Sequence, residues 1–365
     1  MPLAQEATHR AADQQWSARH PVTATRITQR GPLSALVLQC VTRTAETDGD
    51  ALGGLATQAL AASPGIAVDD DIQLALFVLY ASSYGSIPGL DPELEWDPAL
   101  IETRRALEAA FEAELRETVA IPDLPEPTAD AVARALFAFT SEDDGPSLSR
   151  YIAKKATIEQ AREFLIQRSI YTLREADPHS WAIPRLHGRA KAALVEIQAD
   201  EYGNGRPDRV HATIFAATMR GAGLDDAYGA YLDDVPAETL ASLNAMSMFG
   251  LNRRLLGAIV GHLAAFEMTS SIPNRMYGDG FRRLGFGGDV TDYFDEHVEA
   301  DAVHEQIAGR DLAGALAEDH PELLPDIMFG AAVCMRVDGR MGALMFERWS
   351  AGESSLRPRV GGASA

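Results

Sequence analysis

The chain has 365 residues, of which 46% are hydrophobic and 23% charged, an ordinary globular composition that is large enough to bury its own core. Its formal charge of −21 repels phosphate backbones and anionic lipids, which excludes nucleic acids and membrane surfaces as natural partners. Its two cysteines, Cys40 and Cys334, are too few for a disulfide framework, and no export signal or membrane-length apolar stretch is seen, so we expect a soluble protein of the reducing cytoplasm.

Helical patterns dominate the chain and no alternating strand pattern is sustained, so the sequence predicts an all-α fold. Residues 1–30 are polar and are expected to be disordered. Residues 31–146 are expected to form an N-terminal helical region that packs on the remainder or forms a dimer. Its acidic starts, such as Asp69-Asp70-Asp71 before an apolar run, are typical of helix N-termini. The predicted helices of this region lie near residues 48–63, 69–80, 97–118 and 129–139.

A proline-rich break is expected at 121–127 and a second break at 141–146. A second helical domain is predicted after them, at 147–348, and is followed by a flexible tail at 349–365. Within the second domain, breaks are expected at Asp177-Pro178, at Gly203–Pro207, at Ile272-Pro273 and from Gly278 to Gly288. The helices predicted between these breaks lie near residues 157–176, 188–202, 207–221, 236–269, 288–308 and 319–346.

The first candidate metal ligands are His297, Asp301 and His304, which follow a His-x3-Asp-x2-His pattern. At about 100° per residue, three positions with these spacings lie on one narrow face of a helix. Two imidazoles and a carboxylate are ligand types that hold iron, manganese or zinc. The competing interpretation is a solvated acidic face, because four further acidic residues crowd the same helix: Asp292, Asp295, Glu296 and Glu299.

Three more residues strengthen the metal interpretation. Glu267 ends an otherwise apolar run, and a carboxylate is costly to bury unless it is paired or coordinates a metal, although it can also extend to solvent from a helix end. Glu201 ends one predicted helix and His211 begins the next after a Gly/Pro turn, so their side chains can converge. The neighbouring Asp200 is expected to face elsewhere. Glu175 is a weaker candidate, with His179 and His187 as competitors nearby, and His262 is expected to be structural.

These motifs resemble those of the heme-oxygenase-like diiron oxidases and oxygenases, also called iron-containing redox enzymes. The resemblance covers about residues 151–346 and rests on Glu175-Ala-Asp-Pro-His, on Glu-Ile-Gln-Ala-Asp-Glu-Tyr-Gly203 and on the histidine motif. It implies a heme-oxygenase-like seven-helix core that holds two iron ions without heme. The residues that match the family's ligand positions are Glu201, His211, Glu267, His297, Asp301 and His304, with Glu175 in the place of the additional carboxylate of the members that oxygenate nitrogen.

The resemblance also indicates the reaction. In the hydrocarbon- and C–C-cleaving relatives the first Glu and His share one continuous helix, whereas Gly203–Pro207 interrupts that interval here, as in the N-oxygenase group. We therefore expect an O2-dependent N-oxygenase of specialised metabolism that acts on a free amino acid, guanidine or aminoazole through a peroxo-diferric intermediate.

Three alternatives stay open: a diiron oxidase that cleaves C–C or C–H bonds of a fatty or amino acid, a non-catalytic helical metal-binding protein, and a hydrolytic zinc or manganese site. No nicotinamide or flavin motif is evident, because the glycines at 278–288 follow no predicted strand. The electrons must then come from an external donor. We expect a homodimer.

Overall fold

The computed structural model describes residues 27–141 and 147–358, except for the side chains of residues 299–302. All secondary-structure elements described in these two ranges are helices, as the sequence predicts. The sequence predicts disorder for residues 1–30. Of these, residues 1–26 lie outside the described residues, and residues 27–30 are described. These last residues are docked, since the buried side chain of Arg30 donates hydrogen bonds to Asp70 and to the carbonyl of Val235.

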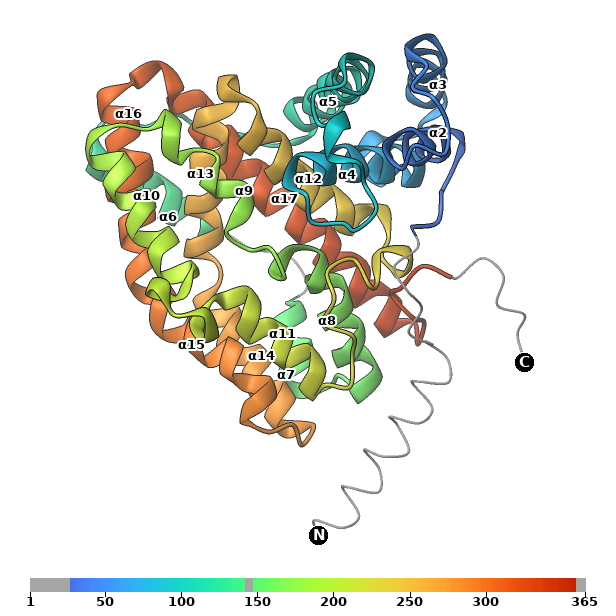
Figure 1. Ribbon diagram of the computed structural model, residues 1–365. Helices are drawn as coiled ribbons and strands as arrows, with labels where there is room; N and C mark the ends of the chain where they lie inside the picture. Colours follow the sequence, from blue (N-terminus) through green and yellow to red (C-terminus); the bar gives the residue numbers. More distant parts are fainter. Residues whose placement is uncertain (1–26, 142–146, 359–365) are drawn as a thin grey trace.

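Helices α2 to α5 gather at one side of the molecule, away from α14 and α15, whereas α6 of the same region lies beside α10 (Figure 1) and packs on the second half of the chain. Aspartates cap three of them: Asp48, Asp69 and Asp97 each accept hydrogen bonds from backbone N–H groups of the first turn. Helix α4 is buried along most of its length and packs on α2 and on α12 of the second half, so one core joins both halves of the chain. These helices are α2 (Pro32–Val41), α3 (Gly49–Ala62), α4 (Asp70–Tyr84), α5 (Pro98–Thr118) and α6 (Ala129–Ser141).

The second half is a bundle in which α13 packs along α17, and α15 packs on α11 and α14. A π-helix, η8 (Ile307–Gly314), continues α15 and packs on α6, α10 and α13. The remaining helices are α7 (Leu148–Lys154), α8 (Ile158–Thr172), α9 (Asp177–Ser180), α10 (Gly188–Glu201), α11 (His211–Gly221), α12 (Ala237–Leu251), α13 (Leu256–Met268), α14 (Ser271–Arg283), α15 (Gly288–Gln306), α16 (Ala315–Asp319) and α17 (Leu324–Ser350).

The predicted break from Gly278 to Gly288 is wrong over its first half, because α14 continues to Arg283. Gly278 and Gly280 are buried inside this helix. A Cβ at position 280 would lie 2.6 Å from the carbonyl oxygen of Ile152 in α7, so the glycine permits the close crossing of two helices rather than a loop. Pro273 falls in the first turn of α14, where a proline is tolerated.

Two further boundaries differ from those expected. The helix predicted at 236–269 is divided at Asn252, whose backbone is extended, into α12 and α13. Residues 349–358, expected to belong to a flexible tail, are packed on the fold: Trp349 Nε1 and the backbone N–H of Ser355 donate hydrogen bonds to the buried carboxylate of Glu163. That carboxylate needs donors because it is buried, and these residues supply them.

One helical stretch, Arg253–Arg283, is long and apolar enough to cross a membrane by length and composition alone, but 61% of its apolar window is buried inside the fold. It comprises α13 and α14 and includes the buried Glu267. Burial among the other helices of the bundle explains its apolar character without a membrane.

Glycines set the distance between α13 and α17. A Cβ at Gly261 would lie 1.8 Å from the carbonyl oxygen of Ile327, and one at Gly330 would lie 1.9 Å from that of Ala258. The two backbones are therefore in direct contact. This contact fixes the position of α13, which carries Glu267.

We expect Gly261→Ala to lower the free energy of unfolding by about 3 kcal/mol, because a methyl group at this crossing forces two backbones apart. Gly53→Ala is the matched control: Gly53 lies in the middle of α3 with no atom within 4 Å of its Cβ position, and alanine there should stabilise the helix by about 1 kcal/mol. Urea unfolding of both variants tests this, and equal stability of the two would show that the α13–α17 crossing adapts freely.

Candidate metal centre

Six of the seven candidate ligands come together inside the bundle, and all six are buried. They come from four helices and one turn. Glu175 lies in the turn between α8 and α9, Glu201 ends α10, and His211 begins α11. Glu267 lies in the last turn of α13, while His297 and His304 project from α15.

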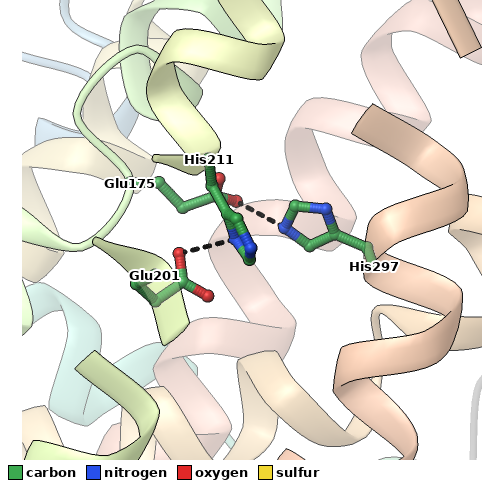
Figure 2. A group of neighbouring side chains, drawn as sticks. All are labelled: Glu175, Glu201, His211 and His297. Carbon is green, nitrogen blue, oxygen red and sulfur yellow. Dashed lines mark ion pairs between the residues drawn. The ribbon is translucent and has the colours of Figure 1, made fainter. Parts of the chain in front are cut away.

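The first donor group contains Glu175, Glu201, His211 and His297, whose potential ligand atoms all lie within 4.8 Å of one another. Figure 2 shows the two carboxylates and the two imidazoles pointing toward a common centre. Nδ1 of His211 lies 3.0 Å from Oε2 of Glu201 without forming a hydrogen bond, and Nε2 of His297 lies 3.7 Å from Oε1 of Glu175. The imidazole rings of His211 and His297 are 4.4 Å apart between centroids.

The second donor group contains Glu201, Glu267 and His304, again with potential ligand atoms within 4.8 Å of one another. Nδ1 of His304 lies 3.5 Å from Oε2 of Glu267. Glu201 belongs to both groups. The arrangement is therefore that of two adjacent metal positions with one carboxylate available to both.

The polar atoms of the donor set show whether these residues fit a cation. Buried polar atoms normally have hydrogen-bond partners, yet five atoms of this cluster have none. They are Glu175 Oε2, Glu201 Oε2, His211 Nδ1, His297 Nε2 and His304 Nδ1. Three buried carboxylates without enough donors are costly, and coordination of cations removes that cost. The residues present fit iron, which takes imidazole and carboxylate ligands.

The charges in the cluster are strongly coupled. Burial raises the pKa of Glu175 to about 8, with the adjacent Glu201 carboxylate acting in the same direction. Burial opposes protonation of His211 and His304, but neighbouring carboxylates outweigh it and raise the pKa of each to about 9. Burial and the nearby His211 lower the pKa of His297 to about 3, so this imidazole is neutral.

Two residues outside the predicted set orient the histidines. Asp200 accepts a hydrogen bond at 2.9 Å from Nε2 of His304, which leaves Nδ1 directed at the cluster. This corrects the expectation that Asp200 faces elsewhere. Asp200 lies in the last turn of α10 next to Glu201, close enough to α15 for its carboxylate to reach the imidazole ring of His304. Nδ1 of His297 donates to the carbonyl of Tyr293 at 2.8 Å, which leaves Nε2 directed at the cluster. Such hydrogen bonds fix the tautomer and orientation of metal-binding histidines.

Tyr293 also holds a ligand directly. Its hydroxyl donates a 2.7 Å hydrogen bond to Oε1 of Glu175, and its ring lies 4.2 Å from that of His297. It precedes His297 by four residues on α15, so the helical spacing was a signal that could have identified it. Nothing in the local sequence around Asp200 indicated its contact with His304.

We expect Tyr293→Phe to weaken metal binding in the first donor group by about 10- to 100-fold, because Glu175 loses the group that orients it. Stability should fall by only about 1 kcal/mol for the lost hydrogen bond. Tyr277→Phe is the control, since the Tyr277 hydroxyl makes no hydrogen bond to any described residue. Calorimetric titration with Mn(II) and thermal unfolding separate the two effects, and unchanged affinity would show that Glu175 needs no support.

Four other residues were candidates or competitors in the sequence: Asp301, His179, His187 and His262. Asp301 is in α15, but its side chain is outside the description, so its role as a ligand stays a prediction. His179 and His262 are buried and contact each other at 3.3 Å through Nε2 and Nδ1, whereas His187 is exposed. The acidic face of α15 also exists: Glu296 and Asp292 pair with Arg209, and Asp295 pairs with Arg282. The helix therefore has an acidic outer face and an inner face of potential ligands.

Comparison with known proteins agrees with this geometry. Residues 162–339 match the model of a family described as iron-containing redox enzymes. The match covers just under half of the chain. The all-α fold of the described residues is consistent with a heme-oxygenase-like fold, and the buried cluster of His and Glu is compatible with iron binding.

The chain is also similar to a curated protein, the nitrosourea synthase of Streptomyces achromogenes subsp. streptozoticus. The two are 30% identical over 172 residues, which is 47% of this chain and 36% of the relative. The similarity therefore spans little more than a third of the relative's length.

Proposed function

We propose that the protein is an O2-dependent diiron oxygenase that oxidises an amine-type nitrogen of a small molecule. The observation that carries the proposal is the pair of donor groups joined by Glu201. A single metal ion would leave the negative charge of one donor group uncompensated, whereas two metal ions would compensate the charges of both groups. The similarity to a nitrosourea synthase supports oxidation of nitrogen, since a nitrosourea carries an oxidised nitrogen.

The chain's own residues have separable tasks in this proposal. Glu175, His211 and His297 would hold one iron, Glu267 and His304 the other, and Glu201 would contact both. Bound iron would supply the reaction with O2 and the change of oxidation state. Tyr293 and Asp200 would keep ligands in the required orientation, as their hydrogen bonds to Glu175 and His304 indicate.

The surrounding side chains would position the substrate and exclude bulk water. A cavity borders the cluster and is lined by Glu175, Glu201, Glu267 and His297 together with Tyr171 and Phe266. The two aromatic rings lie 4.9 Å apart between centroids. A nitrogen held in this cavity would lie next to the donor groups, and enclosure by these side chains would favour orientation over reaction with solvent.

The test is to load the protein with Fe(II) without oxygen and then add O2 with a panel of amines, guanidines and aminoazoles. We expect rapid O2 consumption and a product with oxygen on nitrogen, identified by mass spectrometry with labelled O2. The Zn(II)-loaded protein is the matched control, because zinc has no accessible redox change.

The alternatives give different results. Loss of carbon from a fatty or amino acid would favour a C–C-cleaving oxidase. Product formation by the Zn(II) form without O2 would favour a hydrolase. Iron binding without any O2 consumption would favour a non-catalytic metal-binding protein.

We further propose a separate reductant as the source of electrons, a cytoplasmic setting and a homodimer. The two cysteines support a reducing environment, since both are free and buried. Product formation that requires an added reductant would support the external donor, and sedimentation analysis would measure the oligomeric state.

A further inference from the structure

The cavity that borders the two donor groups is also lined by a histidine that the metal site does not use. His179 lies in α9 and is only 2% exposed. Close packing positions this short helix, because a Cβ at Gly250 of α12 would collide with the carbonyl oxygen of Pro178. The fold therefore fixes where the His179 ring stands relative to the donor groups.

One nitrogen of the His179 ring is used and the other is open. Nε2 lies 3.3 Å from Nδ1 of His262, which is a hydrogen-bond distance. Nδ1 of His179 makes no hydrogen bond to any described residue, yet it is not sealed from solvent. Because His179 lines the cavity and is otherwise buried, this nitrogen opens into the cavity.

His262 closes the other end of the pair. It is fully buried, its ring stacks on that of Phe266 with 5.7 Å between centroids, and it contacts Phe249 edge-on at 6.4 Å. Its second nitrogen, Nε2, is sealed from solvent and has no hydrogen-bond partner in the parts of the chain that the structure describes. The pair is therefore a closed unit and offers no route for a proton from solvent to the cavity.

The protons of this pair have two alternative arrangements. Burial lowers the pKa of both histidines, that of His179 to about 4, so both rings are neutral and each carries one proton. In the first arrangement both rings are protonated on Nδ1, so His262 donates to Nε2 of His179, and Nδ1 of His179 presents an N–H to the cavity. In the second arrangement both are protonated on Nε2, and His179 presents a lone pair instead.

Two observations favour the first arrangement. The second would leave an N–H of His262 in an apolar interior without an acceptor, and buried N–H groups without partners are rarer in proteins than buried acceptors without partners. On the cavity side, the Glu201 carboxylate is close enough to oppose the effect of burial on the pKa of His179. An N–H directed toward carboxylates is attracted by their charge, whereas a lone pair is repelled.

We infer that His179 is a hydrogen-bond donor of the cavity, with its Nδ1–H directed toward an anionic group or oxygen held beside the two donor groups, and that His262 is the positioning residue that fixes this N–H. The arrangement of the protons does not depend on the proposed function, but the task of the donor rests on it. Oxygen that accepts electrons gains negative charge, and a donor already in place stabilises that charge without reorganisation. His179 keeps its proton in this task, since His262 cannot replace it.

The first test locates the protons directly. Histidine with isotopically labelled ring nitrogens is incorporated into the protein, which is loaded with diamagnetic Zn(II), and long-range proton–nitrogen NMR correlations give the tautomer of each ring. The variants His179→Asn and His262→Asn assign the two signals by their loss. We expect both rings to be protonated on Nδ1. Protonation of both on Nε2, or an imidazolium at either position, would overturn the inference.

The second test measures the donor with azide, a small anion that binds metal ions, on the Co(II)-loaded protein through the visible spectrum of the metal. We expect His179→Leu to weaken azide binding by about tenfold or more, as for a lost hydrogen bond to a charged group. His179→Asn, whose amide can offer an N–H near the place of Nδ1, should lose less than about threefold. His187→Asn, an exposed change, should have no effect.

Two variants of His262, which does not line this cavity, test the positioning role. His262→Leu removes the donor to Nε2 of His179, so His179 should show a mixture of tautomers and azide should bind about threefold more weakly. His262→Asn can donate from the place of Nδ1 and should restore both properties. His179 protonated on Nδ1 with unchanged azide affinity in His262→Leu would overturn the role of His262.

Misfolding is distinguished from loss of the donor, because a variant that loses its fold also loses Co(II), which the spectrum reports. Azide affinity that is unchanged in His179→Leu would overturn the donor role. If the tautomers and the azide affinities follow the expected pattern but the Fe(II) form oxidises no nitrogen, the donor is supported and the proposed function fails.

Discussion

Glu201→Gln is expected to abolish tight metal binding at both positions, whereas Glu175→Gln and Glu267→Gln each should abolish it at one. The reason is geometric, since Glu201 alone belongs to both donor groups. Each position would lose a charged ligand in a site that already depends on few donors, which should reduce affinity by at least about 100-fold. Metal analysis after exhaustive dialysis and titration with Mn(II) would measure the stoichiometry of each variant.

Glu196→Gln is the matched control for this series, because Glu196 lies on the same helix, α10, but is exposed. It should bind as much metal as the unmodified protein. Retention of one tightly bound metal by Glu201→Gln would contradict a shared carboxylate and would indicate two independent sites. Thermal unfolding gives a second readout, since metal should no longer raise the Tm of Glu201→Gln.

The parts of the site that the sequence predicted are those encoded locally. His297 and His304 share a face of α15 because their spacing and the helical period alone determine it. The convergence of Glu201 and His211 follows from a short turn between two helices. Gly203 allows that turn: its φ of 69° favours glycine, and a Cβ there would lie 2.6 Å from the backbone of Arg209.

The parts that could not be predicted depend on contacts between helices. Asp200 reaches His304 because α10 and α15 lie close together, which no spacing within either helix reveals. The burial of Glu267 depends on the backbone contact of α13 with α17 at Gly261 and Gly330. The sequence predicts a break at Gly278 and Gly280, which lie inside α14, because the packing of Gly280 against α7 is visible only once α7 is placed.

Metal affinity should rise steeply as the pH increases from about 6 to 9. In the metal-free protein, His211 and His304 have pKa values of about 9, and the pKa of Glu175 is about 8. Below these values the three groups carry protons, which a metal must displace before it can use the same atoms. Each displaced proton changes the apparent affinity about tenfold per pH unit, so the logarithm of the dissociation constant should fall with a slope of about two or three.

The raised pKa values of His211, His304 and Glu175 also make the stability of the metal-free protein depend on pH. A group that is more basic in the folded state stabilises the fold fully below its unfolded pKa, and that stabilisation is lost as the pH rises through its folded pKa. The Tm of the metal-free protein should therefore fall between about pH 6.5 and pH 9, while that of the metal-loaded protein should change much less over this range.

His297 serves to distinguish the release of protons on metal binding from a general effect of pH on binding. Its pKa of about 3 means that it is neutral throughout the range, so it has no proton to release. Calorimetry with Co(II) in buffers of different ionisation enthalpy counts the protons released on binding. We expect His211→Gln to lower both the affinity and the number of released protons, and His297→Gln to lower the affinity alone. An equal loss of released protons in both variants would contradict the assignment, because neighbouring carboxylates, Glu201 above all, raise the pKa of His211, whereas burial and the nearby His211 lower that of His297.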